Sequence, residues 1–190
     1  AAAAQPNGVV EDLFSMANLR LESALSMGRT AERLCLQGYY YQRHALTMKA
    51  DKSKRRELVC AERSYHDAYL LAMQVDDPYP ALDWVICKFF ASDNTQKCSD
   101  QQRRDMQSMV DTITRSERIT RERLTSNSSF RERVHLPDAA LLRALLAGQV
   151  DTQMESLTQA YRAVFQVRTT AKERSAALER LDYLAELLVW

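Results

Sequence analysis

The feature of this sequence that most constrains its fold is an apolar stripe in which residues recur three or four positions apart. Its members are Leu58, Ala61, Tyr65, Ala68, Ala72 and Val75. This spacing places them on one face of an α-helix, whereas in a strand alternate residues share a face. A second stripe near the end of the chain consists of Ala177, Leu181, Leu184 and Leu188. The sequence therefore predicts amphipathic helices that bury these stripes against neighbouring helices.

The scarcity of turn-forming residues extends this interpretation to the whole chain. The 190 residues include four Gly and four Pro, which is too few for the many turns of an all-β fold. A hydrophobic fraction of 46% argues against a disordered chain. Helices are predicted over residues 10–27, 31–50, 54–75, 80–91, 100–126, 138–147, 153–167 and 171–189. We therefore expect an all-α fold of stacked antiparallel helical hairpins.

Capping signals mark several of the predicted helix ends. Gly28 follows the first helix, and Thr30 and Ser53 precede the second and third as candidate N-caps. In a capping box, a hydroxyl and the side chain three residues later each bond an otherwise unpaired backbone N–H. Three pairs fit this motif: Ser99 with Gln102, Thr152 with Glu155, and Thr170 with Glu173.

The same pattern suggests a division of the chain. Residues 1–9 are expected to be disordered or derived from a tag. Residues 10–126 form the first set of helical hairpins, and residues 138–190 form the C-terminal hairpins of the same stack. The polar segment 127–137, which ends in Pro137, is a candidate hinge between them.

Small and large residues alternate in a repeated way along three of the predicted helices. The triplets are Ala17, Leu21 and Ala24, then Leu34, Gly38 and Tyr41, then Ala61, Tyr65 and Ala68, with Pro78 closing the third helix. Small residues let two helices approach closely while the large ones fill the gaps. Here the chain resembles tetratricopeptide repeats over residues 10–91, although Gln37 stands where that family usually has leucine. The resemblance implies a right-handed α-solenoid that binds proteins.

A narrower resemblance concerns residues 28–40, 76–84 and 174–184. These strings look like the degenerate repeat region of large bacterial multidomain proteins, which is related to the TRAFs-binding helical domain. In such proteins the helical region is joined to an effector such as a peptidase. The resemblance implies a sensing, scaffolding or autoinhibitory segment, and the 190 residues carry no peptidase motif.

The residues that usually carry chemistry are scattered. The four cysteines, Cys35, Cys60, Cys87 and Cys98, form no C-x-x-C pair and are expected to be free thiols, buried where they fall on apolar helix faces. Three histidines and four isolated glycines give neither a metal-ligand pattern nor a phosphate loop. We therefore expect no catalytic residues, no metal and no cofactor. The alternative is a helical enzyme or signalling fragment whose site is assembled from His44, His66 and Cys60.

The charge pattern bears on an alternative function, the binding of nucleic acid. Lys and Arg total 26 against 25 Asp and Glu, so no global field recruits an anionic partner. Basic clusters at 49–56 and 115–133 would suit a nucleic-acid-binding helical module. Interspersed acidic residues favour salt bridges instead, and nucleic acid is not the expected partner. With no secretory signal and no membrane-spanning apolar run, a cytoplasmic location without a membrane partner is expected.

Aromatic residues are the best candidates for a partner-binding surface. Tyrosine offers a large contact area at low entropic cost, and the candidates on a concave face are Tyr39, Tyr40, His44, Tyr79 and Trp84. They could equally seal the stacked helices. Leu187 and Trp190 broaden the apolar stripe of the last helix, as a docking surface would. The expected partner is a protein, either a neighbouring effector domain or a peptide, and self-association stays open.

Overall fold

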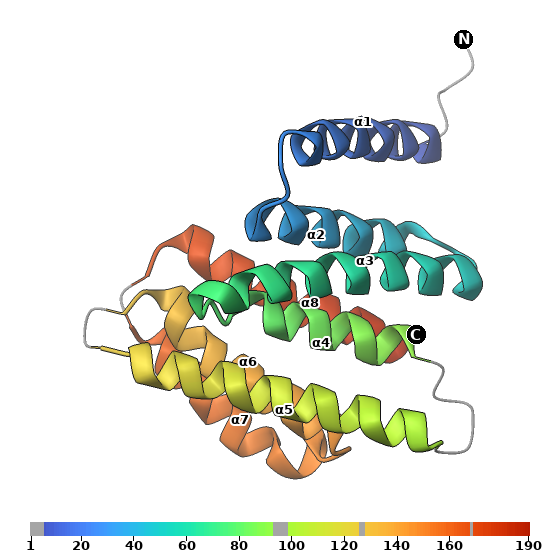
Figure 1. The fold of residues 1–190 in the computed structure, drawn as a ribbon. Coiled ribbons are helices and arrows are strands. Elements are labelled where there is room, and N and C mark those ends of the chain that lie inside the picture. The colour runs from blue at the N-terminus through green and yellow to red at the C-terminus, as the bar shows by residue number, and fades with distance from the viewer. Residues whose placement is uncertain (1–5, 93–98, 126–127, 168) are drawn as a thin grey trace.

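The computed structural model describes residues 6–92, 99–125, 128–167 and 169–190, and these residues form eight α-helices (Figure 1). In chain order the elements are α1 (Pro6–Ser26), α2 (Ala31–Thr47), α3 (Asp51–Ala72), the 3-10 helix η1 (Met73–Val75), α4 (Tyr79–Ala91), α5 (Asp100–Arg123), α6 (Phe130–Leu146), α7 (Val150–Phe165) and α8 (Ala171–Val189). The predicted all-α class is confirmed.

Most helices pack against their neighbours in the sequence. The closest packing joins α2 to α3 and α3 to α4, while α1 lies on the outer side of α2 (Figure 1). Next come α5 and α6, then α6 and α7, and α4 also approaches α6 directly. The helix α8 departs from this order, because its backbone packs more closely on α6 than on α7.

The predicted small-and-large pattern is the packing pattern between α2 and α3. Gly38 is buried, and a Cβ atom added there would lie 2.6 Å from ring carbons of Tyr65. Tyr65 is 3% exposed, and its hydroxyl donates to Oε1 of Gln42 at 2.9 Å. The stripe residues Leu58, Ala61, Ala68 and Ala72 are also buried. Val75 is an exception, since it lies in η1 and is exposed.

The remaining pattern positions differ in burial. Leu34 and Pro78 are buried, whereas Tyr41 is half-buried on α2. The three positions on the outer helix α1 are half-buried as well: Ala17, Leu21 and Ala24. The pattern therefore marks the interfaces of α2 with both of its neighbours.

Most of the predicted caps are present. The Thr30 hydroxyl accepts from the backbone N–H of Arg33, and both Ser99 with Gln102 and Thr170 with Glu173 form complete capping boxes. Gly28 has φ of +131°, in the region that glycine tolerates best.

Two predicted caps are wrong. The helix α3 begins at Asp51 with Ala50 as its N-cap, so Ser53 already lies inside the first turn. The helix α7 begins at Val150, and the Thr152 hydroxyl donates to the backbone carbonyl of Gln149 instead of capping a helix. In both cases the helix begins two residues upstream of the hydroxyl.

The candidate hinge is largely helical, which corrects the predicted boundary. The helix α6 starts at Phe130 behind a capping box of Ser129 and Glu132, and Pro137 lies inside it, buried. Buried Phe130, Val134 and Leu142 continue one helical face across the proline. Helix α1 likewise starts at Pro6, so residues 6–9 are helical, whereas residues 1–5 and 126–127 lie outside the described residues.

Limited trypsin digestion is expected to cleave the basic segment 49–56 first. Lys49 and Lys52 are exposed at the junction of α2 and α3, where helix ends open most easily. Arg63 is the internal control, because its side chain is exposed but its backbone lies in the middle of α3. Mass spectrometry of early fragments checks the order, and cleavage after Arg63 before Lys49 or Lys52 would contradict it.

Candidate functional site

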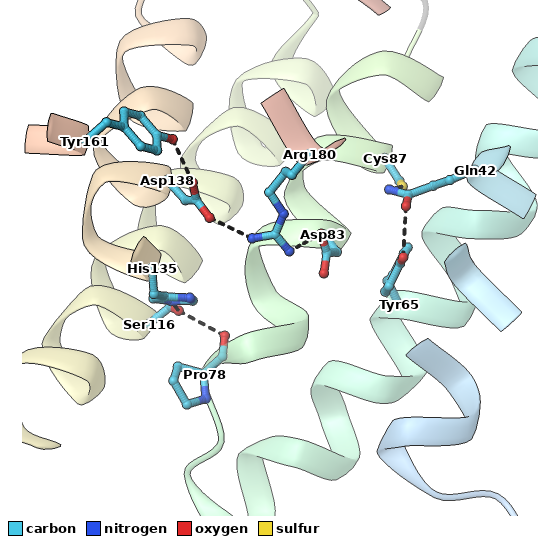
Figure 2. A network of polar contacts seen from close by, with 10 residues as sticks. All are labelled: Gln42, Tyr65, Pro78, Asp83, Cys87, Ser116, His135, Asp138, Tyr161 and Arg180. Atoms are coloured by element: carbon cyan, nitrogen blue, oxygen red, sulfur yellow. Dashed lines mark hydrogen bonds and ion pairs between the residues drawn. The ribbon is translucent and has the colours of Figure 1, made fainter. Parts of the chain in front are cut away.

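The helix α8 lies across the faces of α2, α4 and α6, and its arginine Arg180 binds two acidic residues there. The guanidinium donates from Nη2 to Oδ1 of Asp83 on α4 at 2.6 Å and from Nη1 to Oδ2 of Asp138 on α6 at 2.8 Å (Figure 2). The other oxygen of Asp138 accepts from the Tyr161 hydroxyl of α7 at 2.6 Å. We call these four residues the Arg180 cluster. It joins three helices to α8.

The two carboxylates of the Arg180 cluster keep the Arg180 guanidinium charged. The side chains of Arg180, Asp83 and Asp138 are 28%, 20% and 8% exposed. Burial raises the pKa of Asp83 even though the Arg180 charge opposes the shift. Burial disfavours the charged guanidinium, but the two carboxylates outweigh it and raise the pKa of Arg180. Without Arg180, two nearby carboxylates would face each other with little solvent.

The rest of α8 divides into a packed face and an exposed face. Tyr183, Leu184 and Leu187 are buried, and Leu187 is 2% exposed. Leu188, which the predicted stripe placed on the packed face, is 54% exposed. The helix is therefore rotated relative to that prediction, and Leu187 belongs to the core while α8 is docked.

Trp190 closes the end of α8. Its indole N–H donates to Oδ1 of Asp51 at 2.7 Å, and the Lys54 ammonium lies 5.0 Å from the ring centroid. At 36% exposure it lies at the edge of the packed face. One turn of the basic segment 49–56 is thus a docking point for the end of α8.

A second site is the groove between α1 and α2, where the structure brings Tyr39 and Tyr40 together with apolar residues of α1. We call it the α1/α2 groove, and its principal lining residues are Leu13, Met16, Leu21, Leu36, Tyr39 and Tyr40, with Arg20 and Arg43 beside them. Four of these apolar side chains are strongly exposed: Leu13 at 61%, Met16 at 52%, Leu36 at 57% and Tyr39 at 46%. Exposed apolar patches of this kind mark interaction sites.

His44 supports the floor of the α1/α2 groove. Its ring centroid lies 4.8 Å from that of Phe14 and 5.8 Å from that of Tyr40. Its Nδ1 lies 3.0 Å from Oε2 of Glu57. His44 is therefore held in place between α1 and α3, and it contacts the rings of Phe14 and Tyr40, which line the groove.

Tyr79 and Trp84 lie elsewhere, so the five aromatic candidates do not form one concave face. Trp84 is 4% exposed, its ring stacks on Tyr69 at 5.5 Å, and its indole N–H donates to Glu62 at 2.8 Å. Tyr79 is half-buried under the Arg131 guanidinium, 3.9 Å from the ring centroid. Trp84 therefore packs between stacked helices. This is the second of the two roles that the sequence analysis gives for the aromatic candidates.

A buried serine–histidine pair is the arrangement in the described residues that most resembles a catalytic site. Ser116 Oγ lies 2.6 Å from Nε2 of His135 and donates to the carbonyl of Pro78 at 3.0 Å (Figure 2). A hydroxyl has one proton, so when Ser116 donates to Pro78 the imidazole donates to Ser116 and is not its base in that arrangement. Burial, helped by Arg180 and Arg131, lowers the pKa of His135 to about 3. This pair fastens α5 and α6 to the start of α4.

Burial raises the pKa of each described cysteine thiol. Burial raises the pKa of the Cys35 thiol to about 12, with Asp83 adding to the shift. Burial also raises the pKa of Cys60 and of Cys87, whose sulfur accepts from Gln42 at 3.2 Å. The reactive form is the thiolate, which these shifts suppress. Cys98 lies outside the described residues.

The described part of the chain has neither a metal-ligand cluster nor a membrane-spanning helix. No group of three or more His, Cys, Asp or Glu side chains there is arranged to hold a metal ion. None of its helices has the length and apolarity that crossing a membrane requires.

Many residues of the second basic cluster have local partners. Arg118 pairs with Glu122 at 2.9 Å, and Arg121 and Arg143 both bind Glu117. Arg133 donates to the backbone carbonyl of Ser128 at 3.0 Å. The pairs with Glu117 and Glu122 are salt bridges of the kind that the interspersed acidic residues predict.

Comparison with known proteins adds no assignment: no protein-family model, no curated protein and no solved structure matches the chain. The resemblance to tetratricopeptide repeats therefore depends on the sequence pattern alone. The Arg180 cluster was not predicted, although Asp83 was visible as an acidic residue in the apolar stretch of α4.

Proposed function

We propose that this chain is a non-catalytic protein–protein interaction module, and that it serves as a sensing, scaffolding or autoinhibitory segment of a larger bacterial protein in the cytoplasm. The helices α1 to α4 form degenerate hairpins of the tetratricopeptide type, and the hairpins that follow extend them into one right-handed α-solenoid. The close approach of α2 and α3 at Gly38 and Tyr65, and the direct approach of α4 to α6, support this proposal.

The observation that carries the proposal is the exposed α1/α2 groove. Helices α1 and α2 are antiparallel (Figure 1). The Phe14 ring of α1 contacts the rings of Tyr40 and His44 of α2. Along α2, Leu36 and Tyr39 are three residues apart and share a face, as do Leu13 and Met16 on α1. These two apolar stripes lie side by side, and the α1/α2 groove runs between them. A helix of a partner can lie in such a groove and place one apolar stripe against both α1 and α2.

Charge narrows the choice of partner. Arg20 lines the end of the α1/α2 groove near the α1–α2 connection, and Arg43 lines the opposite end. Arg43 already binds Glu179 at 3.1 Å, so Arg20 is the side chain better placed to attract an acidic residue. The groove therefore suits an amphipathic helix with a leucine stripe and an acidic residue at the Arg20 end.

Binding of synthetic amphipathic helices tests this proposal. The probe is a fluorescent peptide with a two-turn leucine stripe and glutamate at one end, and its counterpart carries lysine there. Leu36→Glu in the full chain is expected to weaken binding of the glutamate peptide about tenfold, because it places a charge on the groove floor. Arg20→Glu is expected to reverse the preference between the two peptides by about threefold, as exposed ion pairs do.

Leu70→Glu is the matched control, because Leu70 on α3 is 52% exposed and lies outside the groove. It should leave peptide binding unchanged. Equal binding to the wild-type chain, Leu36→Glu and Leu70→Glu would contradict the proposal. Circular dichroism confirms that each variant keeps its helices.

A further inference from the structure

The position of α8 differs from that of a last helix in a simple stack. Its backbone packs more closely on α6 than on the preceding α7. Its side chains bind α2 through Glu179 and Arg43, α4 through Asp83, and the first turn of α3 through Trp190 and Asp51. The helix thus lies along the stack and contacts several hairpins, as a bound helical ligand does.

The chemistry of this contact is that of an amphipathic helix in a groove. Arg180, Tyr183, Leu184 and Leu187 are spaced so that they project from one face. The arginine binds the two acidic residues Asp83 and Asp138, and Leu184 and Leu187 enter the core. The surface that α8 covers therefore recognises an arginine and two leucines that follow it one and two turns farther along the helix.

The fit of α8 to this surface is imperfect. Among the described side chains, the Tyr183 hydroxyl is a buried polar group without a hydrogen-bond partner. Removing a hydroxyl from water without replacing its hydrogen bond disfavours docking. On the outer face, Leu178, Leu188 and Val189 are 51%, 54% and 89% exposed. A helix with phenylalanine in place of Tyr183 would keep the contacts and lose this unfavourable group.

We infer that the surface formed by α2, α4 and α6 is a binding site for a basic amphipathic helix of a partner protein, and that α8 is its exchangeable internal occupant. The partner helix carries arginine for Asp83 and Asp138, an aromatic residue three positions later, and leucines at the positions of Leu184 and Leu187. Binding therefore requires α8 to leave. This site adjoins the α1/α2 groove, with which it shares Arg43, but it takes a helix of the opposite charge and does not depend on the function proposed for that groove.

The first experiment measures exchange with a peptide of defined sequence. The probe is a fluorescent peptide of residues 170–190 that carries Tyr183→Phe, titrated into the full chain. The wild-type chain should bind it weakly, since α8 competes from within. Arg180→Ala in the chain should tighten binding about tenfold, because it opens the site and leaves both acidic residues to the arginine of the peptide. The same peptide with Arg180→Ala should lose this gain.

Leu178→Ala in the chain is the matched control, because it changes an exposed residue of α8 and leaves the packed face intact. It should bind the peptide as the wild-type chain does. If the Arg180→Ala chain binds no more tightly than this control, the inference is wrong.

The second experiment uses the wild-type chain and so does not depend on the folding of a variant. In native-state hydrogen exchange, the amides of α8 should exchange at lower opening free energy than those of α3 and α4. A saturating amount of the peptide should raise the exchange rate of α8 and leave α3 and α4 unchanged. Opening of α8 only together with α3 and α4 would overturn the inference.

Discussion

Replacing Gly38 with leucine is expected to destabilise the chain by about 3 kcal/mol, the upper part of the usual range for overpacking a core. Even a Cβ atom at this position would lie 2.6 Å from the Tyr65 ring. The ring cannot easily turn away, because it is buried and its hydroxyl donates to Gln42. Relief of the clash therefore requires α2 and α3 to separate, and their interface is among the closest in the fold.

Urea unfolding followed by circular dichroism measures this effect. Leu36→Ala is the control on the same helix, since Leu36 is 57% exposed and its truncation leaves the interface with α3 unchanged. Gly38→Ala should fall between the control and Gly38→Leu. A midpoint for Gly38→Leu equal to that of the control would show that α2 packs on α3 in another register.

Lowering the pH from 7 to 5 is expected to reduce the free energy of unfolding by about 2 kcal/mol through His135. Burial lowers the pKa of this imidazole to about 3 in the folded chain, whereas an unfolded histidine titrates near 6.5. Between these values the unfolded chain binds a proton that the folded chain does not. Stability from this group is therefore complete above pH 6.5 and is lost progressively as the pH falls toward 3.

The variant His135→Gln isolates this contribution. Glutamine keeps an N–H donor for Ser116 but does not titrate, so the loss between pH 7 and pH 5 should shrink by about 2 kcal/mol relative to the wild type. Urea titrations at both pH values provide the comparison. An equal loss in the two proteins would show that the imidazole of His135 is already protonated in the folded chain at pH 5.

The fold was predictable where local patterns decide the structure. The stripe from Leu58 to Ala72 is buried as expected, and Gly38 lies against Tyr65 as the repeat pattern indicates. The helix α6 starts upstream of the predicted boundary because Pro137, a residue that usually bounds a helix, lies inside it. The capping box of Ser129 and Glu132 was present in the sequence and would have placed the start correctly.

The candidate sites were predictable only in part. Tyr39, Tyr40 and His44 lie close together on one helix, so their clustering is visible in the sequence. The Arg180 cluster joins residues 42 and 97 positions apart, and no local pattern encodes such a contact. The exposure of Leu188 was mispredicted for a similar reason. Which face of α8 is buried depends on the helices that it meets, and these follow from the tertiary fold.

The many attachments of α8 have a mechanical consequence. Arg180 connects α4 to α6, Glu179 holds α2, and Trp190 holds the start of α3, so one helix braces hairpins that otherwise touch mainly through their sequence neighbours. A stack of helices that one further helix holds at several points along its length resists bending. Departure of α8 would therefore make the stack more compliant and would let the distance between α1 and α7 vary.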